Sequence, residues 1–168
     1  PQLFVSYAYD SEEHKAWVLK LATDLRQHFG VDVVFDQWDL RIGDDLSLFM
    51  ERGLSNVALV LCICSDSYVI KANAGKGGSG YEKMIMTRAL IKDTDIDYLI
   101  PVIRANTNVI KLPIFLSTKV YIDFSNDSEY GCKLRELAER IQGVDIKRKP
   151  PLVLNPFSSK TADSIDIQ

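Results

Sequence analysis

Short apolar runs alternate along the chain with longer stretches in which apolar residues recur every three or four positions. Runs that are apolar at nearly every position are typical of strands buried on both faces, as in a parallel sheet that helices cover. The pattern therefore predicts five strands, the last weaker than the others: residues 3–5, 31–35, 57–64, 98–103 and 119–122.

The stretches between these runs predict amphipathic helices. Asp10 with Glu13 three residues later resembles a capping box, after which apolar residues fall four apart. The other helix boundaries follow from capping residues and glycines. The second helix is expected to start at Asp44 or Asp45, the third around Gly80, and the last to end at Gly143.

This alternation predicts an α/β fold: a flavodoxin-like, doubly wound, five-stranded parallel sheet with helices on both faces. Residues 57–64 are expected at the centre of the sheet, and Pro101 predicts a local irregularity or an unpaired N–H in the fourth strand. Residues 106–117 show no helical period. We assign residues 1–145 to this domain and residues 146–168 to a linker or C-terminal tail, because Pro150 and Pro151 end the periodic pattern.

Composition narrows the possible functions. The chain has 168 residues, 46% of them hydrophobic, and a formal net charge of -3, so it offers no general attraction to nucleic acid. No apolar run is long enough to span a membrane and no signal peptide is recognisable, so we expect no membrane contact and a cytoplasmic location. The three cysteines, Cys62, Cys64 and Cys132, are expected to be reduced and buried.

Candidate binding residues follow the predicted strands, because ligands of an open parallel sheet bind beyond the carboxyl ends of its strands. Polar and aromatic residues gather at those positions. They are Ser6, Tyr7, Tyr9 and Asp10, then residues 36–45, then Ser65, Asp66 and Tyr68, then Arg104 and Asp123.

Several chemistries lack the residues that they need. A phospho-receiver requires an acidic pair after the first strand and a lysine after the fifth, where Asp123 lies instead. The glycine-rich residues 75–80 lack the Gly-Lys-Ser/Thr order of a phosphate loop, which leaves a flexible active-site loop or a purely structural one. His14 and His28 have no partner at ligand spacing, so we expect no metal site and two solvent-facing histidines. No serine or cysteine has the setting of a hydrolase nucleophile.

One acid remains, Glu82, which follows the glycine-rich residues at the start of the third predicted helix. The helix macrodipole alone favours a glutamate at such a position. A single carboxylate is also sufficient to cleave the N-glycosidic bond of a nicotinamide riboside, because nicotinamide leaves as a neutral molecule without a general acid. The carboxylate would hold the ribose hydroxyls and stabilise the oxocarbenium-like transition state.

Five motifs occur in order along residues 2–142. They are Leu3-Phe4-Val5-Ser6-Tyr7, a strand and polar loop at residues 33–45, an apolar strand with Ser-x-x-Tyr at residues 59–68, Gly80-Tyr81-Glu82-Lys83, and Leu99-Ile100-Pro101-Val102-Ile103. Together they resemble the TIR domain, of the prokaryotic kind that is close to the SEFIR branch. In this resemblance residues 36–45 correspond to the BB loop, and Glu82 corresponds to the catalytic glutamate.

The resemblance implies an NAD+ glycohydrolase or cyclase that is active when assembled, as in bacterial effectors of anti-phage immunity. NAD+ would be the substrate, with no further cofactor, and Glu82 would be the catalytic carboxylate. Enzymes of the family often carry a tryptophan four residues before this glutamate, where Gly78 lies here, so Tyr81, Tyr68 and Trp38 are the candidates for the aromatic wall. The residues implied to bind the substrate are Tyr7, Asp36, Trp38, Asp45, Ser65, Tyr68 and Tyr81.

The alternative is a non-catalytic TIR or SEFIR adaptor that binds other such domains, since a fold does not fix a function. In both cases the resemblance implies self-association in which residues 36–45 contact a second copy. Most charged side chains of this loop are expected to face solvent or a partner. Trp38 is expected to contact a ligand, another copy or its own domain.

Overall fold

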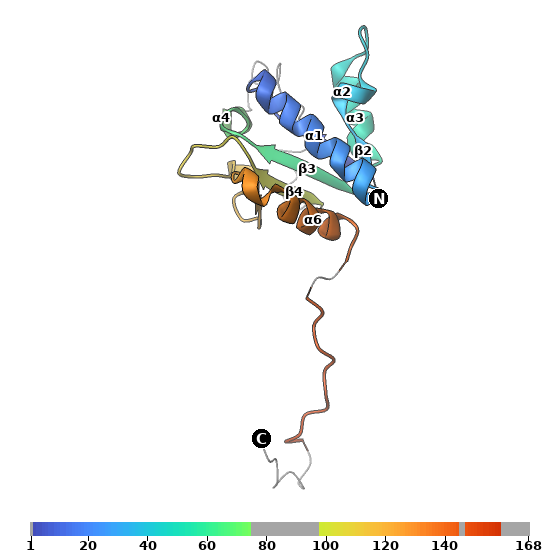
Figure 1. Cartoon of the computed structure of the whole chain (residues 1–168), viewed down its shortest axis with the longest axis vertical. Helices are drawn as coiled ribbons and strands as arrows, with labels where there is room; N and C mark the ends of the chain where they lie inside the picture. The colour runs from blue at the N-terminus through green and yellow to red at the C-terminus, as the bar shows by residue number, and fades with distance from the viewer. Residues whose placement is uncertain (1, 75–97, 145–146, 159–168) are drawn as a thin grey trace.

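The computed structural model of the chain describes residues 2–74, 98–144 and 147–158 (Figure 1). The strands in these ranges are β1 (Gln2–Ser6), β2 (Asp32–Val34), β3 (Leu59–Cys64), β4 (Leu99–Ile103) and β5 (Ile122–Asp123). The helices are α1 (Glu12–Phe29), α2 (Asp36–Asp39), α3 (Leu46–Ser55), α4 (Asp66–Ala74) and α6 (Tyr130–Ile141). Short 3-10 turns lie at Ile114–Leu116 and Asp127–Glu129.

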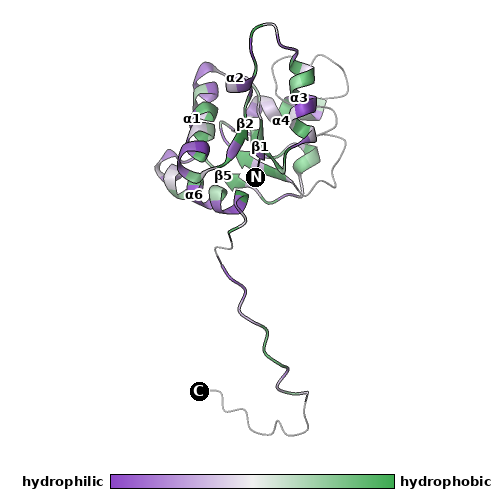
Figure 2. Ribbon diagram, turned by 90° about the vertical axis from the view of Figure 1, so that its right-hand side faces the viewer, coloured by the Kyte–Doolittle hydropathy of each residue, from purple (hydrophilic) through white to green (hydrophobic). Residues whose placement is uncertain are grey.

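The strands form one parallel sheet in the order β2-β1-β3-β4-β5, which confirms the predicted topology with β3 at the centre. Helices α1 and α6 lie on one side of the sheet, and α3 and α4 lie on the other (Figure 2). Because the strands are parallel, their carboxyl ends lie at the same end of the sheet. The residues that follow neighbouring strands are therefore brought close together.

Pro101 lies inside β4, which continues through it, so the local irregularity, one of the two alternatives predicted there, is absent. The carbonyl of Ile103 accepts a hydrogen bond from the N–H of Phe124 on the side of β5. Backbone groups alternate between the two sides of a strand, so Pro101 also faces the side of β5. β5 begins only opposite Val102, and the missing N–H of Pro101 therefore costs no sheet hydrogen bond.

The core lies on both faces of β3, in which every residue after the first is buried. On one face, Trp17 packs edge-on against Phe124 and Tyr130, with ring centroids 5.6 Å and 6.3 Å away. On the other, the ring of Phe4 lies 5.9 Å from that of Phe49 in α3. Each large apolar side chain buried in this way contributes about 1.5–3 kcal/mol to stability.

The start of the first helix differs by one residue from the prediction. Ser11, and not Asp10, caps α1 by accepting a hydrogen bond at 3.0 Å from the N–H of His14. Asp10 is engaged elsewhere, by the hydroxyl of Ser65. Of the two candidates for the second helix, Asp45 caps α3.

Two helices lie where the sequence pattern predicts none. α4 follows β3 directly, and the short α2 occupies the start of the predicted loop at residues 36–45. Between β4 and β5, residues 104–121 contain one 3-10 turn among the described elements, in agreement with the missing helical period. The helix predicted around Gly80 lies outside the described residues.

Residues 147–158 extend away from the domain without helix or strand (Figure 1). α6 ends at Ile141, and the side chain of Gln142 donates a hydrogen bond at 2.7 Å to the carbonyl of Phe29. The tail therefore leaves the domain beside the end of α1. The division of the chain at residue 145 stays a prediction.

Gly53 lies in α3 against the ring of Phe4, where an added Cβ would be 2.5 Å from Cε2. The ring is buried and already packs on Phe49, so it cannot move without disturbing the core. We expect Gly53→Ala to lower the free energy of unfolding in urea by about 1–3 kcal/mol, although alanine is the better helix former by about 1 kcal/mol. Gly131 of α6 is the matched control, because its added Cβ would meet nothing within 4 Å. Equal stability of the two alanine variants would contradict the argument.

Candidate functional site

Tyr7 and Asp36 meet at the carboxyl end of the sheet, Tyr7 directly after β1 and Asp36 two residues after the end of β2. The Tyr7 hydroxyl lies 2.9 Å and 3.1 Å from the two carboxylate oxygens of Asp36. The hydroxyl of Tyr9 donates to the same carboxylate at 2.7 Å. Gln37 then donates from Nε2 to the Tyr7 oxygen at 2.9 Å and to the carbonyl of Lys15 at 3.2 Å.

Asp36 is only 6% exposed, so it is the exception to the expectation that most charged side chains of residues 36–45 face solvent or a partner. A buried carboxylate needs donors around it, and the two phenols supply them. Burial first, and then the neighbouring Asp36 carboxylate, raise the pKa of both Tyr7 and Tyr9 above the ordinary value. Both phenols therefore keep their protons and hold the carboxylate in place.

Ser65 and Tyr68 belong to a second hydrogen-bonded network, between β1 and the start of α4. The hydroxyl of Ser65 donates to Oδ1 of Asp10 at 2.7 Å, and the N–H of Ser67 donates to Oδ2 at 3.1 Å. The hydroxyls of Ser6 and Tyr68 are 2.9 Å apart. Ser65 and Tyr68 have no exposed surface, and burial raises the pKa of Tyr68 well above its usual value. These contacts fix the loop after β1 to the loop after β3.

The remaining loop residues lie on the surface. Trp38 is 39% exposed, and its ring packs edge-on against Phe35 at 5.1 Å. Asp45 accepts a hydrogen bond from the N–H of Leu48 at 2.9 Å and so begins α3. Of the five charged side chains between 36 and 45, four are exposed, as expected, and Asp36 is the exception.

The tip of this loop carries an apolar side chain into solvent. Asp44 accepts a hydrogen bond at 2.8 Å from the N–H of Arg41, which closes the turn. Gly43 has φ of +94°, a conformation that side chains other than glycine rarely adopt. Ile42 is fully exposed at this turn.

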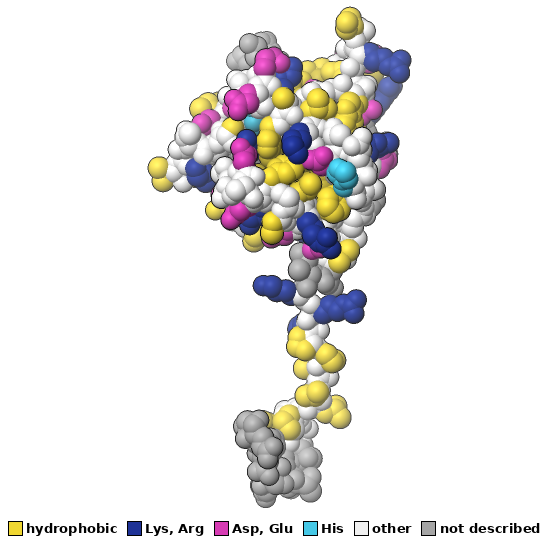
Figure 3. Space-filling model, viewed as in Figure 1, with side chains coloured by type: hydrophobic (Ala, Val, Ile, Leu, Met, Phe, Trp, Pro, Cys, Tyr) yellow, Lys and Arg dark blue, Asp and Glu magenta, His cyan; other side chains and the backbone are white. Residues whose placement is uncertain are grey.

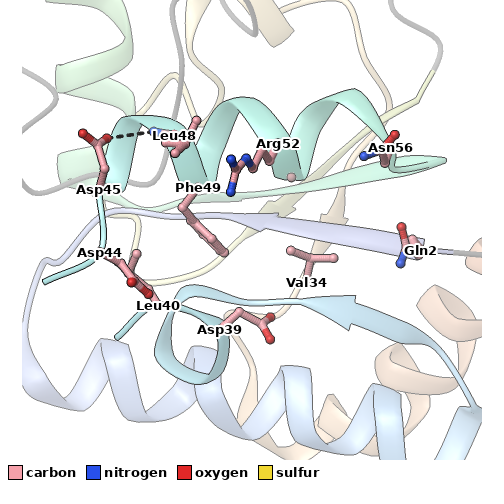
Figure 4. A pocket seen from close by; sticks show the side chains of 11 residues that line it. Gln2, Val34, Asp39, Leu40, Asp44, Asp45, Leu48, Phe49, Arg52 and Asn56 are labelled. Atoms are coloured by element: carbon pink, nitrogen blue, oxygen red, sulfur yellow. Dashed lines mark hydrogen bonds between the residues drawn. The ribbon is translucent and has the colours of Figure 1, made fainter. Parts of the chain in front are cut away.

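The structure places these residues in separate environments. A groove of about 420 Å³ between α3 and β2 includes Asp45 in its lining (Figure 4), and a neighbouring cavity of about 540 Å³ includes Trp38. Tyr7, Asp36, Ser65 and Tyr68 line neither cavity. Glu82, Tyr81 and Gly78 lie outside the described residues. A common substrate pocket for all the predicted residues therefore stays a prediction.

His14 is buried, which corrects the expectation that it faces solvent. It is 4% exposed, and its ring stacks on Trp17 at 6.5 Å. Burial lowers its pKa, Arg104 adds to this effect and Asp10 opposes it. Arg104 also lies against Trp17, with its guanidinium 4.8 Å from the centre of the ring. The same guanidinium forms an ion pair with Asp127. The sequence pattern places Arg104 among the residues that follow the strands, but it gives no sign that His14, three residues before Trp17 on α1, is buried beside it.

No group of three His, Cys, Asp or Glu side chains suited to a metal occurs among the residues that the structure describes. Cys62 and Cys64 are buried and free, and burial raises the pKa of Cys62 to about 12. Cys132 is free but exposed, so the expectation that all three thiols are buried is wrong for this residue. None of the described helices is both long enough and apolar enough to cross a membrane.

Comparisons with known proteins agree with the fold. A family model described as "TIR domain" matches residues 3–138. The crystal structure of a prokaryotic SEFIR domain is 33% identical in sequence, covers 83% of this chain and 96% of its own, and superposes with a TM-score of 0.70. No curated protein matches the chain. The match across residues 3–138 shows that the chain belongs to the TIR domain family.

Proposed function

We propose that this TIR domain is a self-association module and that residues 36–45 form its principal contact. The observation that carries the proposal is Ile42, which is fully exposed at the tip of a turn held by Asp44 and Gly43. An aliphatic side chain presented in this way gains stability when a partner covers it. Trp38 and Leu48 add partly exposed apolar surface on either side of the turn.

A complementary surface lies near the opposite edge of the sheet. It consists of Ile70 on α4 together with Val109, Ile110 and Ile114 between β4 and β5, all exposed; we call it the distal apolar patch. The N–H of Ile114 donates to the side chain of Asn73 at 2.8 Å, so α4 and this segment lie side by side. A loop on one edge and a patch near the other give a head-to-tail contact, which repeats into rings or filaments.

Ile42→Asp tests this contact. We expect the substitution to weaken self-association on the order of tenfold or more, because it places a charge where an apolar side chain would be buried. Sedimentation velocity over a range of protein concentrations measures the effect. Val144→Asp is the matched control, since Val144 is half exposed beyond α6 and away from the loop. Equal association of the two variants would overturn the proposed contact.

NAD+ cleavage is the second candidate function. The observation that favours it is the Tyr7, Tyr9 and Asp36 network, which fixes a carboxylate at the end of the sheet where ligands of such folds bind. The TIR family includes NAD+-cleaving enzymes, and the resemblance of Gly80-Tyr81-Glu82-Lys83 to the family's catalytic motif makes Glu82 the proposed catalytic residue.

In this candidate mechanism Glu82 stabilises the oxocarbenium-like transition state while nicotinamide departs. Tyr7 and Asp36 act as positioning residues, because both are buried and bonded to each other. Trp38, Asp45 and Tyr81 remain proposed substrate contacts. Release of nicotinamide from NAD+ at high protein concentration separates an enzyme from an adaptor.

A further inference from the structure

The tail combines a basic run with apolar side chains that nothing in the described structure covers. Lys147, Arg148 and Lys149 come first, and two prolines follow. The apolar side chains are then Leu152, Val153, Leu154 and Phe157, which are between 76% and 99% exposed. Figure 3 shows these two kinds of side chain in succession along the tail, below the domain. Contiguous exposed apolar side chains mark a binding segment.

Pro150 and Pro151 hold the first part of this segment extended, and Pro156 follows in a turn in which the N–H of Ser158 donates to the carbonyl of Asn155 at 3.2 Å. Proline fixes its own φ and keeps the residue before it out of the helical region. A chain that is already extended loses less conformational entropy when it binds in an extended form. In such a segment Leu152 and Leu154 lie on one face and Val153 lies on the other.

The groove between α3 and β2, which we call the α3 groove, has the shape and polarity for such a segment. Val34, Leu40, Leu48 and Phe49 supply its apolar lining. Figure 4 shows Phe49 pointing from α3 toward β2. β2 is the outermost strand at one side of the described sheet, so one of its edges is not paired with another strand there. The groove volume of about 420 Å³ is sufficient for two leucine side chains.

The charges of the groove and the tail are complementary. Asp39, Asp44 and Asp45 lie along the groove, opposed by the single Arg52. Three cations precede the apolar residues of the tail. Opposite charges at the rim of an interface speed association and fix its orientation, and salt weakens their effect.

We propose that the α3 groove binds residues 147–157 of a second copy of this chain. Leu152 and Leu154 enter between α3 and β2, and the three cations lie against the aspartates of the groove. The tail leaves its own domain on the side of α1 and α6, whereas the groove is formed by α3 (Figure 2). Because its prolines also keep it extended, the tail reaches another molecule, and mutual exchange of two tails gives a closed dimer. The groove shares Leu48 and part of residues 36–45 with the contact proposed above, but Ile42 does not line it, so Ile42→Asp separates the two contacts.

The test measures binding of a fluorescent synthetic peptide of residues 147–158 to the full chain. The chain carries Leu152→Asp and Leu154→Asp, so that its own tail does not occupy the groove. Fluorescence anisotropy is expected to show saturable binding that weakens as NaCl is raised to about 0.5 M. A peptide with Leu152→Ala and Leu154→Ala is expected to bind on the order of tenfold more weakly or worse. A peptide with Val153→Ala is the control and is expected to bind like the parent.

Substitutions in the full chain locate the contact. Leu48→Lys is expected to abolish peptide binding, whereas Ile70→Lys, on the other exposed apolar surface, and Ile42→Asp are expected to leave it unchanged. Failure of the Ile42 contact therefore leaves this assay unaffected. No saturable binding, or equal binding of the double-alanine and Val153→Ala peptides, would overturn the proposal. If the parent chain does not bind the peptide and is still a monomer, its tail occupies its own groove. That result would also overturn the proposal.

Discussion

Replacing Glu82 with glutamine is expected to lower NAD+ cleavage by on the order of a hundredfold or more, with little change in stability. Glutamine keeps the shape of the side chain but removes the charge that would face the oxocarbenium-like transition state. The stability effect is expected to be small, because the sequence pattern predicts Glu82 at the start of a helix, where a charge contributes at most about 1 kcal/mol. Nicotinamide released from NAD+ by concentrated protein, with and without a crowding agent, is the measurement.

Glu51→Gln is the matched control for this experiment, since Glu51 is exposed on α3 and lines neither described cavity. It is expected to cleave NAD+ at the parent rate. Equal rates for the parent and Glu82→Gln would remove Glu82 from the mechanism. A Glu82→Gln protein that loses stability instead would identify a structural residue at a helix start. If the parent itself releases no nicotinamide while it still self-associates, the chain is an adaptor.

The sheet could be predicted because its signal is local. Each buried strand is a short apolar run, and β3 is apolar at every position, as a strand covered on both faces must be. α4 could not be predicted in this way. Its buried residues are Tyr68, Val69 and Ala72, while Ile70 on the same helix is exposed, so no clear apolar stripe marks it. α4 is stabilised by hydrogen bonds and packing between the loop after β3 and other segments of the chain. The sequence of the helix itself does not show these contacts.

The candidate site was predictable in part for a related reason. Parallel pairing of β1 and β2 brings the residues after them together, and Tyr7 and Asp36 do meet. The sequence pattern does not predict the hydrogen bond from Tyr9 to Asp36 or the one from Gln37 to Tyr7. Each of these bonds joins residues from separate segments of the chain. The polar stretch around Asp36 therefore gives no sign that its carboxylate is buried, although residues from other segments bury it.

Removal of the Asp36 carboxylate is expected to have the largest effect on stability. Asp36→Ala leaves the hydroxyl of Tyr7 without its acceptor in a place that has no exposed surface. The free energy of unfolding is expected to fall by about 3 kcal/mol, the range found when one partner of a buried polar pair is removed. Denaturation in urea measures this change. Glu51→Ala, at an exposed position on α3, is expected to stay within about 0.5 kcal/mol of the parent.

The other members of the network predict a graded series. Tyr7→Phe is expected to lower the free energy of unfolding by only about 1–2 kcal/mol. Gln37 still donates to the Lys15 carbonyl, and the Asp36 carboxylate still accepts from Tyr9. Tyr9→Phe is expected to cost less, since Tyr9 is only partly buried. The double variant Tyr7→Phe with Asp36→Ala is expected to be less destabilised than the sum of the two single variants, because the two residues act as a pair. Additive effects would show that the hydrogen bond contributes little. An Asp36→Ala protein more stable than the parent would instead mean that Asp36 is held at a cost in stability, as residues of binding sites are.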